Sequence, residues 1–270
     1  MIPFSDATTH HRTRPVVNIA IISLNALVFL YAIAVGGMGY LTGGSTLGLV
    51  DFFYTWGFIP AELTRGEYLT SVPVRFGPPL EIASIPTWAT IATSMFMHGG
   101  LLHFAGNMAY LWVFGDNIED RIGHVKYLVF YLFTGAIATL SHWFFFQDSV
   151  TPLIGASGAI SGVLGAYLML FPYNRIKVLV IFFFITAVRL PAMYVLGFYL
   201  LLQLFQLVTS LGVSDQVSVA LWAHIGGFAA GAGIVAVYKL ITRQPIWPAR
   251  YDFPSSSSSP PQFWRGRRID

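Results

Sequence analysis

The stretch GASGAISGVLGAY, from Gly155 to Tyr167, is almost entirely small or apolar, yet it contains two serines. Gly158 and Gly162 are four residues apart, so in a helix they share one face and let another backbone come close. A serine at the start of a helix lies beside unpaired backbone N–H groups, which favour negative charge. The stretch predicts a tightly packed buried helix that begins near Ser157. For this window alone, ordinary small-residue packing is the alternative.

The composition around this stretch is that of an integral membrane protein. Of the 270 residues, 55% are hydrophobic and only 10% are charged, whereas soluble proteins have about 25% charged residues. Several segments approach the length of about 20 apolar residues that crosses a bilayer as a helix. The chain has no cysteine, which excludes disulfides, thiolate catalysis and cysteine-based metal sites.

Hydropathy predicts an all-α membrane protein with six spanning helices. The predicted spans are residues 16–36, 101–115, 127–146, 154–171, 190–208 and 220–241. A further apolar run, 176–188, ends at Arg189-Leu190-Pro191. Because proline suits the first turn of a helix, we interpret this run as an interfacial or partly buried connector before a new helix.

Composition also predicts the segments outside the spans. Residues 38–96 are rich in aromatic residues, proline and glycine, which is typical of a long outer loop in the membrane interface. Residues 254–262 have low complexity and predict a flexible tail. We therefore expect an N-terminal cytoplasmic segment (1–15), a membrane domain (16–243) and a Pro/Ser-rich cytoplasmic tail (244–270).

The distribution of lysine and arginine predicts the orientation. If the spans alternate, most of these residues fall on one side, whereas the long outer segment has two arginines against four acidic residues. Cytoplasmic loops have an excess of Lys and Arg, so both termini are expected in the cytoplasm. The first apolar stretch is too long for a signal-peptide core and has no convincing cleavage pattern. A bacterial plasma membrane is the simplest location.

Polar side chains inside a bilayer are costly and mark functional candidates. His103 and Asn107 are four residues apart, so in a helix they project from one face and can both donate to one anion. Hydrogen bonding to neighbouring helices is the alternative for such residues.

A second small-residue face lies in the last span. There Gly227 and Gly231 share one face, and His224 lies a turn nearer the outer end. If the fourth and sixth spans pack through their glycine faces, the Ser157 hydroxyl can hydrogen-bond the His224 imidazole, which places a nucleophile beside its base. No carboxylate is placed to orient that ring, because Asp215 lies in a predicted loop. The residues therefore predict a Ser-His dyad.

These motifs resemble the rhomboid family of intramembrane serine proteases. The resemblance covers about half of the chain and rests on four motifs in order, HGGLLHFAGN (98–107), GDNIEDRIG (115–123), GASG (155–158) and AHIGGFAAG (223–231). It implies a six-helix bundle in which Ser157 is the nucleophile and His224 the general base. It also implies an oxyanion hole made by the side chains of His103 and Asn107 with the backbone N–H of Ser157.

The resemblance implies supporting or structural roles for further residues, namely His98, Glu119, Gly155, Gly158, Gly162, Gly227 and Gly231. The segment 115–123 matches a loop motif that orders a loop and packs helices. One position departs from the family pattern. Some members have, four residues after the nucleophile, a tyrosine that stacks on the catalytic histidine, and here that position is Ser161. Another group must then support the His224 ring.

The implied function is hydrolysis of peptide bonds in the transmembrane segments of single-span or multi-span membrane proteins. We expect the lipid bilayer as surroundings, no metal or organic cofactor and no nucleic-acid partner. A catalytically silent rhomboid-like protein that binds transmembrane helices for quality control is the first alternative. A haem or metal carrier using His98, His103, His142 and His224 lacks an HExxH pattern. A channel or transporter needs polar groups through the whole bilayer, whereas here they cluster in the outer third.

Overall fold

The computed structural model describes residues 2–6, 13–74, 77–181, 185–210 and 215–248, and two short strands beyond them. The helices are α1 (Val16–Gly36), α2 (Leu47–Trp56), α3 (Pro60–Arg65), α4 (Thr87–Thr93), α5 (Leu101–Ile122), α6 (His124–Phe145), α7 (Ser157–Leu170), α8 (Ala192–Ser210) and α9 (Asp215–Ile241), with 3-10 helices η1 (Met38–Thr42) and η2 (Ser94–Phe96). The strands are β1 (Ile2–Asp6), β2 (Ser71–Val72), β3 (Leu80–Glu81), β4 (Arg175–Ile181), β5 (Ile185–Pro191), β6 (Phe263–Trp264) and β7 (Arg267–Arg268).

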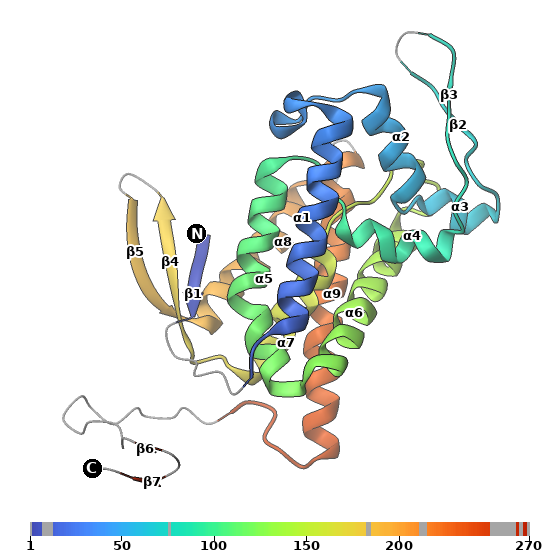
Figure 1. The fold of residues 1–270 in the computed structure, drawn as a ribbon. Helices are drawn as coiled ribbons and strands as arrows, with labels where there is room; N and C mark the ends of the chain where they lie inside the picture. Colours follow the sequence, from blue (N-terminus) through green and yellow to red (C-terminus); the bar gives the residue numbers. More distant parts are fainter. Residues whose placement is uncertain are drawn as a thin grey trace.

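The long helices form a bundle around α7 (Figure 1). Every residue of α7 from Gly158 to Tyr167 is buried, and the helix contacts α5, α6, α8 and α9. A helix that is small or apolar on all sides has no face that requires water, so it occupies the centre.

All six predicted spans coincide with helices, namely α1, α5, α6, α7, α8 and α9. Within the described chain, α1, α6 and the segment Leu221–Ile241 of α9 are long and apolar enough to cross a membrane, and α7 and Ala192–Leu207 are shorter apolar helices. Two ends differ clearly from the prediction. The last helix, α9, begins at Asp215, which was predicted in a loop, rather than at residue 220, and α5 continues to Ile122 rather than ending at residue 115. The motif at 115–123, predicted as a loop, therefore forms the last turns of a helix.

A tertiary contact accounts for this extension of α5. The Glu119 carboxylate is fully buried and accepts hydrogen bonds from the backbone N–H groups of Val17, at 2.9 Å, and Asn18, at 2.7 Å. These groups belong to the first turn of α1, which has no intrahelical acceptors for them and attracts negative charge. His124, the first residue of α6, contacts the same carboxylate. Glu119 thus joins three helices at one point.

The all-α prediction was wrong for residues 175–191. There β4 and β5 form an antiparallel hairpin, and β1 pairs with β4 to give a sheet of order β1-β4-β5 beside α5 (Figure 1). Ile176 and Val178 are buried whereas Arg175 is exposed, which is the two-residue period of a strand. The run is rich in β-branched residues, which fit a pleated surface. The predicted interfacial or partly buried connector is therefore a pair of strands.

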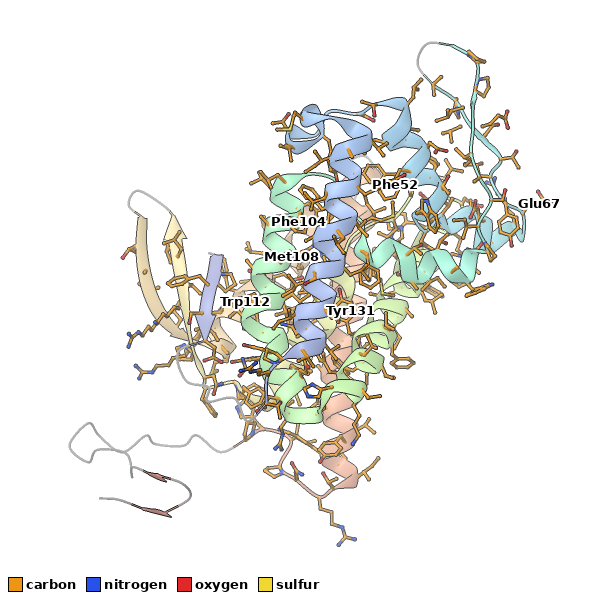
Figure 2. The ribbon with its side chains drawn as sticks, viewed as in Figure 1. Phe52, Glu67, Phe104, Met108, Trp112 and Tyr131 are labelled. Atoms are coloured by element: carbon orange, nitrogen blue, oxygen red, sulfur yellow. The ribbon has the colours of Figure 1, made fainter. Side chains whose placement is uncertain are left out.

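The sheet packs on α5 through apolar side chains. Pro3 and Phe4 of β1 line a shared pocket with Met108 and Trp112 of α5, and Figure 2 shows these two α5 residues along the helix. The N-terminal segment, predicted only as a cytoplasmic extension, thus includes a strand of this sheet. The predicted flexible tail lies mostly at 249–262, outside the described residues.

The outer segment between α1 and α5 is folded rather than a plain loop. It contains η1, α2, α3, the strand pair β2-β3, α4 and η2, so it too departs from the all-α prediction. Tyr40, Leu49 and Phe52 pack with Phe29 of α1 and Met97 in a small apolar core of their own. This subdomain lies at one end of the bundle (Figure 1).

Candidate active site

Ser157 is the first residue of α7, and the chain before it is held from two sides. Phe58 and Leu153 exchange two backbone hydrogen bonds, 3.1 and 2.7 Å long, and Gly155 N–H donates to the Ser94 carbonyl at 2.9 Å. Gly155 has φ 132°, a conformation that residues with a Cβ rarely adopt. The outer subdomain therefore fixes where the serine enters the bundle, at the first turn of α7, where a helix lacks internal acceptors for its first N–H groups.

Glycines bring α9 against α7. A Cβ added at Gly227 would lie 2.1 Å from the carbonyl oxygen of Gly158, and one at Gly231 would lie 1.9 Å from that of Gly162. Both distances are far below van der Waals contact, so no larger residue fits without separating the helices. The glycine face of α9 thus packs on the backbone of α7 and places His224 next to Ser157. The predicted contact between two glycine faces was wrong in part, because the Cβ positions of Gly158 and Gly162 face Ala138 and Thr134 of α6.

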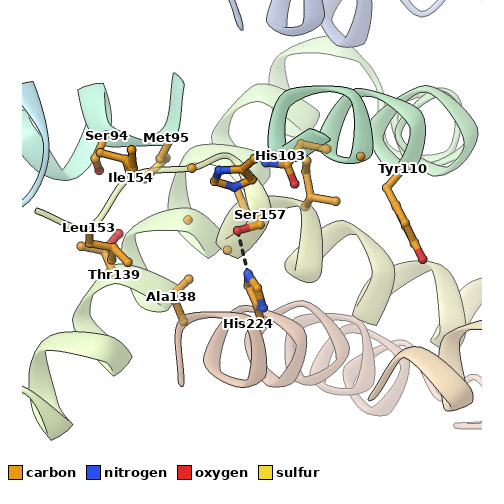
Figure 3. A pocket seen from close by; sticks show the side chains of 18 of the residues that line it. Ser94, Met95, His103, Tyr110, Ala138, Thr139, Leu153, Ile154, Ser157 and His224 are labelled. Atoms are coloured by element: carbon orange, nitrogen blue, oxygen red, sulfur yellow. Dashed lines mark hydrogen bonds between the residues drawn. The ribbon is translucent and has the colours of Figure 1, made fainter. Parts of the chain in front are cut away.

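The two side chains are within hydrogen-bond distance. His224 Nε2 lies 2.7 Å from Ser157 Oγ (Figure 3). This is the separation needed for an imidazole to accept the hydroxyl proton. They line a cavity of about 420 Å³ together with His103, Asn107, Tyr110 and small residues of α6 and α7.

His103 lies on the other side of Ser157 from His224 (Figure 3). Its Nδ1 accepts the backbone N–H of Gly99 at 3.2 Å, so in the neutral ring the proton is on Nε2. A Cβ at Gly155 would lie 2.9 Å from that Nε2 and 3.5 Å from Ser157 Oγ. Glycine at this position therefore leaves the space between the histidine N–H and the serine open.

Asn107 lies one turn further along α5 and lines the same cavity. Its Nδ2 is buried and has no hydrogen-bond partner among the described residues. A buried donor without an acceptor is unfavourable by about 1 to 3 kcal/mol. Such a group, facing a cavity beside a hydroxyl, can donate to an oxygen that arrives with a ligand.

His98 packs against the ring of His103 and is not one of the residues that line the cavity. It is 1% exposed, and its ring packs edge-on against those of His103 and Phe104, at centroid distances of 5.0 and 5.4 Å. Burial, together with the neighbouring His103, lowers the pKa of His98 to about 3. The ring is therefore neutral near pH 7 and acts as packing for His103.

Ser161 does not contact His224 in place of the tyrosine found in some rhomboids. It is fully buried; its Oγ donates to the Ser157 carbonyl at 2.8 Å and lies 2.8 Å from the Tyr199 hydroxyl of α8. The group that does contact the imidazole is Gln203 of α8, whose Oε1 is 3.2 Å from His224 Nδ1. Sequence reasoning missed Gln203, although an amide within an apolar run of a helix was a usable signal.

Comparisons with known proteins agree with this architecture. Residues 86–241 match the family model described as Rhomboid domain. The chain is 33% identical over 119 residues to the rhomboid protease GluP of Bacillus subtilis, covering 44% of this chain and 23% of that protein. It is 30% identical over 132 residues to the mitochondrial presenilin-associated rhomboid-like protein of Bos taurus, covering 48% and 33%.

A chloroplast relative has a similar identity over a shorter stretch. The chain is 32% identical over 80 residues to the chloroplastic rhomboid-like protein 11 of Arabidopsis thaliana, covering 30% of this chain and 28% of that protein. The alignments thus span between 23% and 33% of the length of these three relatives. The family model covers more than half of the present chain, which belongs to the rhomboid family of integral membrane proteins.

Proposed function

We propose that this protein is an intramembrane serine endopeptidase in which Ser157 is the nucleophile and His224 the general base. The observation that carries the proposal is the 2.7 Å contact between Ser157 Oγ and His224 Nε2, two residues that line one cavity. The similarity to a relative named as a rhomboid protease supports the same reading.

The surrounding donors suit acyl transfer. His224 takes the hydroxyl proton as Ser157 Oγ attacks the scissile carbonyl. The developing oxyanion accepts hydrogen bonds from His103 Nε2, Asn107 Nδ2 and the Ser157 backbone N–H. His224 then protonates the leaving amine, and water in the cavity hydrolyses the acyl-enzyme. No step requires a metal or an organic cofactor.

The substrates we propose are transmembrane segments of other membrane proteins. A peptide bond inside an intact helix has its carbonyl engaged and shielded, because backbone groups in lipid are satisfied within the segment. The substrate must therefore unwind locally before its carbonyl can enter the cavity.

We further propose that α1, α5, α6, α7, α8 and α9 all cross the membrane, with both termini in the cytoplasm of a bacterium. The short α7 is compatible with this topology, since its neighbours on all sides are other helices and it has no lipid-facing stretch to match to the bilayer. The excess of basic residues near the chain ends supports the orientation.

Cleavage of single-span substrates in liposomes tests the dyad. Wild type is compared with Ser157→Ala and His224→Ala, and with Ser45→Ala, the same change at an exposed serine outside the cavity. We expect cutting by wild type and Ser45→Ala and loss of at least about 10³-fold in both dyad variants. Equal cutting by all four proteins would overturn the proposal. Helix binding by wild type without any cutting would favour the catalytically silent alternative.

A further inference from the structure

Gln203 of α8 both lines the cavity and contacts the His224 imidazole. It is half-buried, lines the cavity, and its Oε1 lies 3.2 Å from His224 Nδ1. The helix segment around it, Leu200-Leu201-Leu202-Gln203-Leu204-Phe205, is otherwise apolar. A primary amide in such a helix is unfavourable in lipid unless its donors and acceptor have partners.

Hydrogen-bond directions can be followed from the backbone of α7 to Tyr199 of α8, on the same helix as Gln203. Ser161 Oγ lies 2.8 Å from the Ser157 carbonyl, and because a carbonyl only accepts, Ser161 must donate its single proton there. Tyr199 OH is 2.8 Å from Ser161 Oγ, so Tyr199 must donate to Ser161. The Tyr199 oxygen is then left as an acceptor.

Gln203 follows Tyr199 by four residues, so the two side chains lie on the same face of α8. Its amide oxygen Oε1 faces His224 and lies 3.2 Å from Nδ1. An amide oxygen is only an acceptor, so the proton of the neutral imidazole belongs on Nδ1. The unprotonated Nε2 then faces Ser157 Oγ.

We propose that Gln203 is a positioning residue that holds His224 in the Nδ1–H tautomer, so that Nε2 is free to take the Ser157 proton. This inference rests on the proposed proteolytic function. It assigns the third position that the sequence left empty, because Asp215 begins α9 nine residues before His224, roughly 13 Å along the helix axis. The contact with Gln203 supports the ring in place of a stacked tyrosine.

Labelling of Ser157 by a fluorophosphonate probe measures the function of this network without a protein substrate. Gln203→Met keeps the length and volume of the side chain but removes the acceptor, and we expect its labelling rate to fall about 10- to 100-fold. Gln203→Glu keeps an acceptor facing Nδ1, and we expect it to remain within about threefold of wild type. Gln206→Met makes the same change at an exposed position of the same helix and should label like wild type.

The outcomes separate the inference from the proposed function. If wild type fails to label while remaining folded, the proposed function fails. If wild type labels and Gln203→Met labels equally fast, Gln203 has no positioning role and the inference is overturned. A parallel loss in Gln203→Met and Gln203→Glu would also overturn it, because the acceptor would then be irrelevant.

A second measurement does not depend on catalysis. Nitrogen-15 NMR of histidine-labelled protein distinguishes the two ring tautomers, and His224→Gln identifies the signals of His224. We expect one Nδ1–H tautomer in wild type and a mixture in Gln203→Met. An unchanged tautomer in Gln203→Met contradicts the inference even if the protein hydrolyses nothing.

Discussion

At the scale of single residues, the side chain of Asn107 is unfavourable for stability and is proposed to act as an oxyanion donor. Its buried Nδ2 lacks a partner among the described residues, so removing the amide relieves an unsatisfied donor. Asn107→Ala is therefore expected to leave the unfolding midpoint unchanged or raised, while kcat falls about 10²- to 10³-fold through loss of an oxyanion donor. Substrate cleavage and thermal unfolding in detergent measure the two effects. A drop in stability with unchanged kcat would show a structural role instead.

His98 predicts a pH dependence of stability. Its pKa is about 3 in the folded protein against 6.5 ordinarily, chiefly through burial, so between these values the unfolded chain binds more protons. Stability is then fully present above about pH 6.5 and declines on acidification, by at most about 1.4 kcal/mol per pH unit from this group. His98→Gln should flatten the fall in unfolding midpoint between about pH 6.5 and pH 4. Parallel curves for the two proteins would contradict this assignment.

At the scale of elements, the contact between α7 and α9 decides whether the dyad forms. Gly227→Ala places a methyl group against the Gly158 carbonyl, at 2.1 Å without relaxation. We expect a loss of about 1 to 3 kcal/mol in stability from overpacking and at least about tenfold lower cleavage as His224 moves away from Ser157.

Gly233→Ala is the matched control on the same helix, because a Cβ there meets nothing within 4 Å. Alanine is a better helix former than glycine by about 1 kcal/mol, so this variant should be as stable as wild type or more stable, with normal activity. If the two variants behaved alike, close packing at Gly227 would not be what positions the histidine.

The junction of α1, α5 and α6 is a second element-scale contact. Glu119→Gln keeps one carbonyl oxygen for two N–H donors and removes the charge at the start of α1, which should lower stability by about 1 to 3 kcal/mol. Glu67→Gln makes the same change at an exposed residue of the outer segment, distant from this junction (Figure 2), and should be neutral. Unfolding midpoints of the two variants test this prediction; equal midpoints would contradict it.

At the scale of the whole molecule, the proposed orientation can be tested directly because the chain has no cysteine. Single substitutions Ser45→Cys and Glu67→Cys lie on the proposed outer side, and Thr13→Cys and Arg243→Cys on the cytoplasmic side; all four positions are exposed. A membrane-impermeant maleimide should label the first pair in intact cells and the second pair only after permeabilisation. The reverse pattern would invert the proposed topology.

The local pattern of the sequence was sufficient to predict the six long helices, but not the shorter helices α2, α3 and α4 of the outer segment. Helical periodicity depends on neighbours three and four residues away, so the spans and the glycine faces of α7 and α9 were readable without the fold. The spacing of His103 and Asn107 predicted a shared face for the same reason. These predictions use only contacts within one helix or one small-residue motif.

Only the tertiary structure determined the features that depend on distant partners. Residues 175–191 form strands because their backbone groups find hydrogen-bond partners. These partners are supplied by β1, near the N-terminus, and by the two strands of the hairpin themselves. The last turns of α5 are helical where Glu119 caps α1. Gln203 is placed at His224 by the packing of α8 against α9. Strand pairing and side-chain partners are non-local, so no window of sequence contains the information that specifies them.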